Sequence, residues 1–201
     1  VLEGLAYRIT PFNFGSRGVV DSDLMYNNMM NRFKYGNVAD KNFYLDETVS
    51  RMCETHRRMF MMLADALVRR VEKDKALKAL KKCKEVLPAY TVPYDDDDSQ
   101  LAAIWLAAGD KQEAARVAKA VLDYDMQYMR YISSLGQDHV NTYGRSCYFM
   151  FSSIIEASDA LKKADPKAHK MYEMQIQRMI STPSFQLGMQ YYQQQMSAAA
   201  Q

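Results

Sequence analysis

The chain has 201 residues, of which 48% are hydrophobic and 25% are charged, and this is the composition of an ordinary globular protein. Its 26 basic side chains against 24 acidic ones give a net charge of +2, which argues against a dedicated nucleic-acid-binding protein. With 8 Gly, 5 Pro and little alternation of Val, Ile and Thr, the sequence favours helices over strands. We therefore predict an all-α fold.

Three cysteines lie far apart, and each falls in an apolar helical pattern. We expect Cys53, Cys83 and Cys147 to be buried free thiols, and their spacing does not indicate a metal site. No apolar run reaches the ~18 residues of a membrane-spanning helix, and no signal peptide is visible. Because the chain begins at Val1 and not at Met, we expect a piece of a longer protein.

Residues 1–45 are predicted to form a lead-in with one helix. The glycines of Gly15–Gly18 could cradle a phosphate, but the segment lacks the Lys-Ser/Thr of a phosphate-binding loop, so a turn is favoured. Asp21 or Ser22 can then accept hydrogen bonds from the free amides of a first helical turn, and apolar residues follow at helical spacing. We expect the helix to end near Tyr35, before a polar connector.

A long helix is predicted from Asp46, whose carboxylate lies at the positive end of the helix dipole. His56 is interpreted as a core histidine with a satisfied hydrogen bond, with a ligand or a base as the alternative. The apolar side, expected to face the core, carries Val49, Met52, Cys53, His56, Met59, Phe60, Leu63 and Leu67. The opposite face carries Arg51, Thr55, Arg58, Met62, Asp65 and Arg69.

A second helix is predicted from Asp74 to Leu87, and Pro88 ends it because proline has no amide hydrogen. Basic residues are frequent between Arg69 and Lys84. The simplest interpretation is a solvated face. The alternatives are a surface for anionic headgroups or a phosphorylated ligand, and RNA binding by a helical repeat.

Four aspartates, Asp95–Asp98, precede the predicted third helix. They lack the alternating pattern of a calcium loop, and carboxylates are favourable at a helix N-terminus without any metal. After a turn at Gly109, a fourth helix is expected from Lys111 to about Ser133. Its aromatic stripe predicts packing, with ligand stacking as the alternative, and consists of Tyr124, Tyr128 and Tyr131.

Capping helices are predicted over residues 138–196. The first carries an apolar stripe that includes Tyr143, Cys147, Met150, Phe151, Ile154, Ile155 and Leu161. Asp165-Pro166 and Thr182-Pro183 each place a capping residue before a proline at the first helical position. They predict helices over Pro166–Ile180 and Pro183–Met196. Because no linker interrupts the chain, we expect one domain, 1–201.

Residues 46–133 are interpreted as two repeat-like hairpins. Their turns, Glu72-Lys73-Asp74-Lys75-Ala76-Leu77 and Asp110-Lys111-Gln112-Glu113-Ala114-Ala115, both place charged residues before an Ala-rich helix. This layout resembles tetratricopeptide repeats, which have a period of about 34 residues. We expect antiparallel helical hairpins that form a short right-handed solenoid, closed by the capping helices.

Several sequence blocks support a further resemblance. They are Leu2-Glu3-Gly4-Leu5-Ala6-Tyr7-Arg8, Met25-Tyr26-Asn27-Asn28, Asn31-Arg32-Phe33-Lys34-Tyr35-Gly36-Asn37, Tyr44-Leu45-Asp46-Glu47 and Val92-Pro93-Tyr94. They resemble the C-terminal soluble region of a family of large bacterial multi-pass membrane proteins of unknown function. That family is itself similar to membrane-embedded glycosyltransferases that use lipid-linked sugar donors. The Asp95–Asp98 run departs from the expected pattern, in which aromatic or aliphatic residues follow Val-Pro-Tyr.

This resemblance implies a soluble accessory or scaffolding domain on the periplasmic side of the inner membrane, tethered through a transmembrane region outside this chain. The implied partners are a protein or a glycan/peptide acceptor, together with the membrane portion of the parent chain. In such enzymes the catalytic acid lies in a membrane-proximal loop. We therefore expect no enzymatic activity, catalytic residue, cofactor or metal in this chain, and no nucleic-acid partner.

Repeat hairpins present their first helices on a concave surface. This predicts a binding groove that suits an acidic or phosphorylated group and is lined by Arg51, Thr55, Arg58, Met62 and Gln100. The alternative is a protein–protein interaction module unrelated to glycosylation. The oligomeric state stays open.

Overall fold

The computed structural model describes residues 1–11, 19–135, 137–183, 185–187, 189, 190, 193 and 197. These residues form helices and isolated bridges but no extended strand, which confirms the all-α prediction for the described part of the chain. The predicted Gly15–Gly18 turn and half of the predicted helix over 183–196 lie outside the described residues.

The chain divides into two compact units. Unit 1 contains Val1–Pro93 and Ala107–Asp110, and unit 2 contains Tyr94–Leu106 and Lys111–Gln201. The expectation of one domain over 1–201 stays a prediction.

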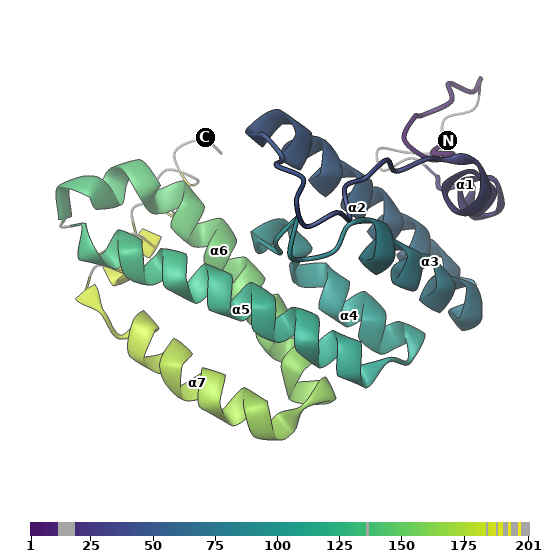
Figure 1. The fold of residues 1–201 in the computed structure, drawn as a ribbon. Helices are drawn as coiled ribbons and strands as arrows, with labels where there is room; N and C mark the ends of the chain where they lie inside the picture. Colours follow the sequence, from purple (N-terminus) through teal and green to yellow (C-terminus); the bar gives the residue numbers. More distant parts are fainter. Residues whose placement is uncertain are drawn as a thin grey trace. The chain divides into compact units, whose positions relative to one another are not determined.

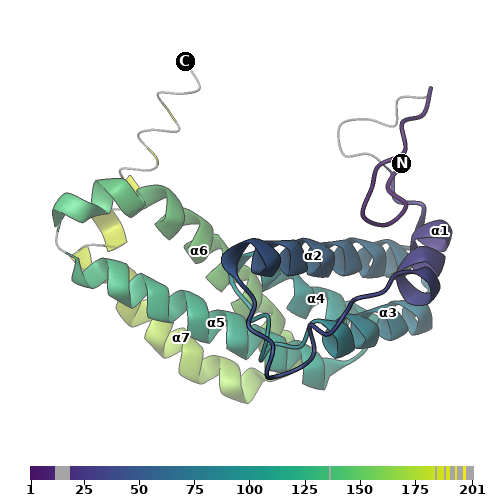
Figure 2. The same cartoon turned by 45° about the horizontal axis from the view of Figure 1, so that its top comes forward.

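Unit 1 is built on an antiparallel pair of helices. Its elements are α1 (Ser22–Asn27), η1 (Asn28–Arg32), α2 (Glu47–Arg69) and α3 (Lys73–Val86). Helices α2 and α3 follow one another in sequence and pack together in opposite directions (Figure 1). Helix α1 lies at the end of α2 where the chain turns into α3 (Figure 2), because Arg70 in that turn donates to Ser22 Oγ at 2.5 Å and to Asp23 Oδ2 at 2.8 Å.

The first helix ends earlier than predicted. Asp21 caps it by accepting a hydrogen bond from the Leu24 amide at 3.0 Å, as expected. The helix then continues as the π-helical turn η1, and the backbone becomes extended at Phe33, with φ −74° and ψ 143°. The Tyr35 hydroxyl donates to the Met29 carbonyl at 2.8 Å. Tyr35 therefore helps to satisfy the end of the helix and is not part of it.

The buried face of α2 differs from the predicted stripe. Cys53, Phe60, Leu63 and Leu67 are buried as expected, but the core also contains Arg57, Met61 and Ala64. Val49 and Met52 were expected to face the core, and they are 37% and 57% exposed. The prediction was wrong for these two residues because periodicity locates an apolar stripe but does not determine how far along the helix other elements cover it.

The turn between α2 and α3 contains a strained residue. The amide of Glu72 donates to the Leu67 carbonyl and the amide of Val71 donates to the Val68 carbonyl, both at 2.9 Å, which is the Schellman pattern of helix termination. Val71 lies at the left-handed position of this motif, with φ 64°. Glycine usually occupies that position, as at Gly109 with φ 110° in the turn after α4, and a β-branched side chain there is an outlier.

Replacing Val71 with glycine is expected to raise the free energy of unfolding of unit 1 by about 0.5–1 kcal/mol, since relief of the left-handed strain exceeds the added entropy of the unfolded chain. Hydrogen exchange of α2 and α3 would measure the change. Val71→Ala keeps a Cβ and is the matched control, so it should gain less. A glycine variant less stable than the parent would contradict this account.

Unit 2 contains three long helices in series. Its elements are η2 (Asp96–Asp98), most of α4 (Ser99–Ala108), α5 (Lys111–Ser134), α6 (Gln137–Ala164) and α7 (Pro166–Ile180). Helices α5, α6 and α7 run alternately in opposite directions and pack together (Figure 1). The buried side chains include Trp105, Ala114, Val117, Val121, Leu122, Met126, Met129, Ile154 and Leu161.

Capping residues determine where these helices begin. The Asp165 carboxylate accepts from the Ala168 amide at 3.0 Å and pairs with Lys119 at 2.8 Å, and Pro166 opens α7 as predicted.

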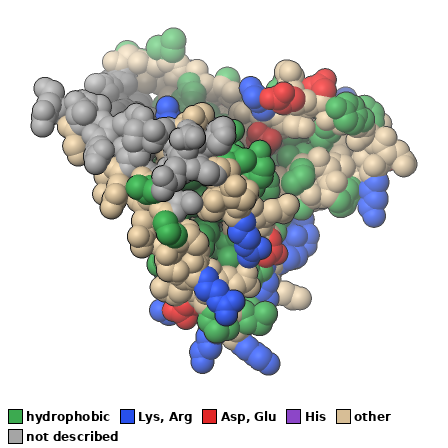
Figure 3. Space-filling model, turned by 90° about the vertical axis from the view of Figure 1, so that its left-hand side faces the viewer, with side chains coloured by type: hydrophobic (Ala, Val, Ile, Leu, Met, Phe, Trp, Pro, Cys, Tyr) green, Lys and Arg blue, Asp and Glu red, His purple; other side chains and the backbone are tan. Residues whose placement is uncertain are grey.

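On α6, the stripe prediction was wrong for Ile155, which is exposed. Lys and Arg side chains gather in the lowest part of the space-filling view, where Figure 1 places α7 (Figure 3).

Candidate functional site

The start of α2 organises the predicted binding residues of unit 1. The Asp46 carboxylate accepts from the Val49 amide at 2.9 Å and so satisfies the first turn. One turn later, Arg51 pairs with Glu47 at 2.5 Å. Because residues four apart lie on the same side of a helix, this pair holds the Arg51 side chain along the helix surface.

Four of the five predicted groove residues lie together on α2. Arg51, Thr55 and Arg58 are exposed and Met62 is half-buried, at the three-and-four spacing of one helix face. The Thr55 hydroxyl donates to the Arg51 carbonyl at 3.0 Å. The fifth residue, Gln100, is exposed near the start of α4 and belongs to unit 2.

An open depression lies on this part of α2. Its lining includes the predicted residues Arg51 and Thr55 and three that the prediction did not include, Glu47, Thr48 and Met52. Met52 therefore lines the same depression as the Arg51–Glu47 ion pair. This combination offers an apolar contact next to paired charges.

Exposed apolar side chains occur both in the connector before α2 and in the first two turns of α2. Phe43 and Tyr44 are 54% and 87% exposed, and they precede the exposed Val49 and Met52 in the sequence. We call these four residues the apolar edge of α2. Large apolar side chains that gather at a surface and are rimmed by polar residues are typical of interaction sites. Periodicity assigned two of them to the core, and no sequence signal distinguishes a covered from an uncovered stripe.

Arg57 is the most important residue that the sequence analysis missed. It lies in the middle of α2 with 1% of its surface exposed. Its guanidinium donates to the Pro93 carbonyl at 3.0 Å and to the Val92 carbonyl. Arg57 thus attaches the segment after α3 to α2, and its role is structural.

The ring of His56 on α2 has a local hydrogen-bond partner, and the three cysteines of the chain are buried. The His56 ring is half-buried, not fully buried as expected, and its Nδ1 lies 2.6 Å from the Met52 carbonyl, which satisfies it locally. Cys53, Cys83 and Cys147 are buried free thiols, as predicted. Burial raises the pKa of the Cys53 and Cys147 thiols, which favours the unreactive protonated form.

Unit 2 holds one buried carboxyl group with an unusual pKa. Asp125 on α5 is fully buried, and Ser153 on α6 donates to its Oδ2 at 2.6 Å. Its Oδ1 has no hydrogen-bond partner among the described residues. Burial raises the pKa of Asp125 from 3.8 to about 7. Because the group is fully buried, its titration bears on the stability of unit 2.

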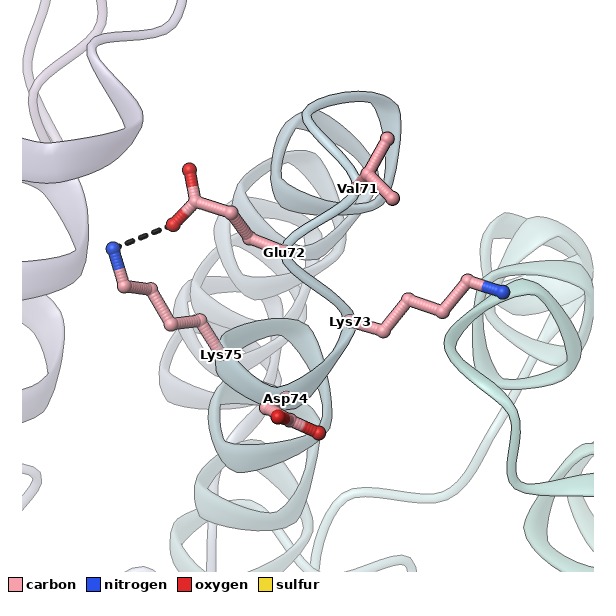
Figure 4. Close-up of a pocket in the computed structure, with 5 residues that line it drawn as sticks. All are labelled: Val71, Glu72, Lys73, Asp74 and Lys75. Atoms are coloured by element: carbon pink, nitrogen blue, oxygen red, sulfur yellow. Dashed lines mark ion pairs between the residues drawn. The ribbon is translucent and has the colours of Figure 1, made fainter.

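Much of the basic strip between Arg69 and Lys84 is neutralised within unit 1. Arg70 pairs with Asp23 and Glu72 at 2.8 Å each, and Lys75 pairs with Glu72 at 2.5 Å. A small open depression at the α2–α3 turn is lined by Val71 to Lys75, and Figure 4 shows the Lys75–Glu72 pair on one side and Lys73 extending away on the other. These pairs lower the positive charge available to an anionic partner.

The aspartate run and the tyrosine stripe both lie in unit 2. Asp95 accepts from the Asp97 amide at 3.1 Å, and Asp98 is buried, so the run forms a capped 3-10 turn that leads into α4. This confirms the helix-terminus interpretation of the run. The rings of Tyr128 and Tyr131 pack edge to face with centroids 6.4 Å apart, and Tyr131 is exposed.

The described residues contain neither a metal-binding cluster nor a membrane-spanning helix. No group of three or more His, Cys, Asp or Glu side chains among them is arranged to hold a metal ion. No helix in the described ranges is long and apolar enough to cross a lipid bilayer. No known protein family, curated protein or solved structure matches the chain. The two family resemblances therefore stay predictions.

Proposed function

We propose that this chain is a non-catalytic accessory domain of a membrane glycosyltransferase-like protein and that it binds an acceptor or partner protein through α2. In this proposal, the α2–α3 and α4–α5 hairpins are tetratricopeptide-like repeats of a short right-handed solenoid, and the later helices cap it. The domain lies on the periplasmic side, tethered by a transmembrane region of a longer chain. Its support is the sequence resemblance together with the surface of α2.

The observation that carries the proposal is the uncovered first half of α2. Val49 and Met52 belong to an apolar stripe that is buried farther along the helix, yet here they are exposed. Covering such side chains is favourable by roughly 25 cal/mol per Å² of apolar surface removed from water. A partner that packs on the apolar edge would continue the core that unit 1 leaves open.

The charged face of α2 that carries Arg51, which lines the depression together with Met52, indicates the chemistry of the partner. Arg51 and Arg58 are exposed on the same face. A matching surface would place an apolar side chain against Met52 and an acidic or phosphorylated group near the two guanidinium groups. A peptide or glycan-bearing acceptor with such a segment fits this description.

The double variant Arg51→Ala/Arg58→Ala is expected to bind the partner about tenfold more weakly, because each exposed charge contributes up to about 1 kcal/mol. A photo-crosslinking residue at Met52 would first identify the protein in contact, and affinity would then be measured by titration. Lys78→Ala/Lys81→Ala on α3 removes the same charge and is the matched control. Unchanged affinity of the Arg51/Arg58 variant would refute the assigned surface.

The link to glycosylation has its own test. Removal of residues 1–201 from the longer parent chain should reduce sugar transfer or change the range of acceptors. If transfer and acceptor range stay the same while the crosslinked partner still binds α2, the chain is an interaction module unrelated to glycosylation.

A further inference from the structure

A further pocket lies in unit 2, at the ends of α5 and α7. It has a volume of about 680 Å³ and is lined by Arg130, Ser133, Gln175, Arg178, Met179 and Thr182, with Ser134 beside them. Small-molecule sites typically have volumes of roughly 300–1,000 Å³. This pocket is thus large enough for a small ligand, and it belongs to a different unit from the surface of α2.

Two guanidinium groups give the pocket its charge. Arg130 comes from α5 and Arg178 from the last turn of α7. Arg130 donates to the side-chain oxygen of Gln175 at 2.8 Å, which is a neutral partner. Among the described residues, no carboxylate forms an ion pair with either arginine. The pocket therefore carries two positive charges that the described part of the chain does not balance.

The simplest structural role for these arginines would be to satisfy the carbonyl groups at the helix ends. Hydroxyl groups already do so. Ser134 donates to the Tyr131 carbonyl at 2.6 Å, and Thr182 donates to the Met179 carbonyl at 2.7 Å. Ser181 donates in the same way to the backbone of α7. Both guanidinium groups therefore keep donors for a ligand in the pocket.

The residues that line the pocket also indicate the chemical class of its anionic ligand. The buried Met179 is part of the lining, and the methylene groups of the two arginines add apolar surface. A phosphate monoester bears about −1.5 to −2 charges at neutral pH, which matches two guanidinium groups better than a single carboxylate does. Arginine also binds phosphate through two parallel hydrogen bonds.

We propose that the pocket between the ends of α5 and α7 binds a small phosphate monoester with an apolar body, and that Arg130 and Arg178 hold the phosphate. Phenyl phosphate is a suitable probe, and isothermal titration with the full chain measures its affinity. We expect saturable binding that is tighter than that of inorganic phosphate, which lacks the apolar body, and tighter than that of benzoate, which carries one charge.

The variant Arg130→Met/Arg178→Met is expected to bind phenyl phosphate at least tenfold more weakly, with an unchanged circular dichroism spectrum because both side chains are exposed. Lys167→Met/Lys170→Met on α7 removes the same charge from the basic surface outside the pocket, and it should change the affinity less than twofold. Equal weakening in both variants would reduce the effect to general electrostatic attraction and overturn the proposal. Lack of saturable binding by the parent protein would overturn it as well.

Discussion

Replacing Arg57 with alanine is expected to destabilise unit 1 by about 3–5 kcal/mol. The substitution removes the donors that serve the carbonyl groups of Val92 and Pro93, of which Val92 is buried. It also leaves a cavity in the middle of α2. Because domains are typically stable by only 5–15 kcal/mol, this loss should expose much of unit 1 to local unfolding.

Separate measurements on the two units can show that the destabilisation by Arg57→Ala is confined to unit 1. Trp105 is the single tryptophan and lies in unit 2, so its fluorescence reports on that unit. Hydrogen exchange of α2 and α3 reports on unit 1. We expect Arg57→Ala to accelerate exchange in α2 and α3, whereas Arg51→Ala on the exposed face of α2 should cost less than about 1 kcal/mol. Exchange rates in α2 that are equal for the two variants would show that Arg57 does not hold the segment after α3.

The stability of unit 2 is expected to fall as the pH rises from about 4 to 7, because of Asp125. Its pKa is about 7 in the folded protein and 3.8 for the ordinary carboxyl group. In this window the folded state keeps the proton and the unfolded state has released it. The unfolded state therefore binds fewer protons, and the free energy of unfolding decreases with pH until both states are ionised.

The size of this effect follows from the shift in pKa. Each pKa unit corresponds to 1.36 kcal/mol, so the loss from Asp125 is on the order of 4 kcal/mol. Denaturant titrations followed by Trp105 fluorescence between pH 4 and 8 would measure it. Asp125→Asn should make the contribution independent of pH and stabilise unit 2 at pH 8, since an amide carries no charge in the buried site.

A matched variant on the same helix distinguishes the effect of burying a carboxyl group from the effect of removing one negative charge. Asp123 lies two residues earlier on α5, is exposed, and accepts a hydrogen bond from the Tyr172 hydroxyl at 2.8 Å. Asp123→Asn should keep the pH dependence of the parent protein. If Asp125→Asn keeps the same slope as well, the buried carboxyl group does not titrate in this window.

Local signals in the sequence predicted most helix boundaries. Asp46 and Asp165 accept hydrogen bonds from first-turn amides as expected, and Pro166 begins α7. These predictions succeeded because a cap acts on amides within three residues of itself, so its effect does not depend on distant parts of the chain. The predicted end at Tyr35 failed because a π-helical turn changed the backbone before it.

The sequence could predict only part of the proposed binding groove. Arg51, Thr55, Arg58 and Met62 share a face of α2 because helical spacing requires it. Gln100 was included because the two hairpins were treated as equivalent repeats. The structure places Gln100 in unit 2, whereas the other four residues belong to unit 1. Periodicity also assigned Met52 to the core, although what surrounds Met52 depends on elements that are far away in the sequence.

The sequence by itself determined that the described chain is helical and where its helices begin, since composition, capping residues and prolines act locally. Only the tertiary structure decided which faces are covered. It buried Arg57 against two carbonyl groups and Asp125 against Ser153, and it left Val49 and Met52 exposed. Burial depends on contacts between residues distant in sequence, so spacing along one helix does not predict it.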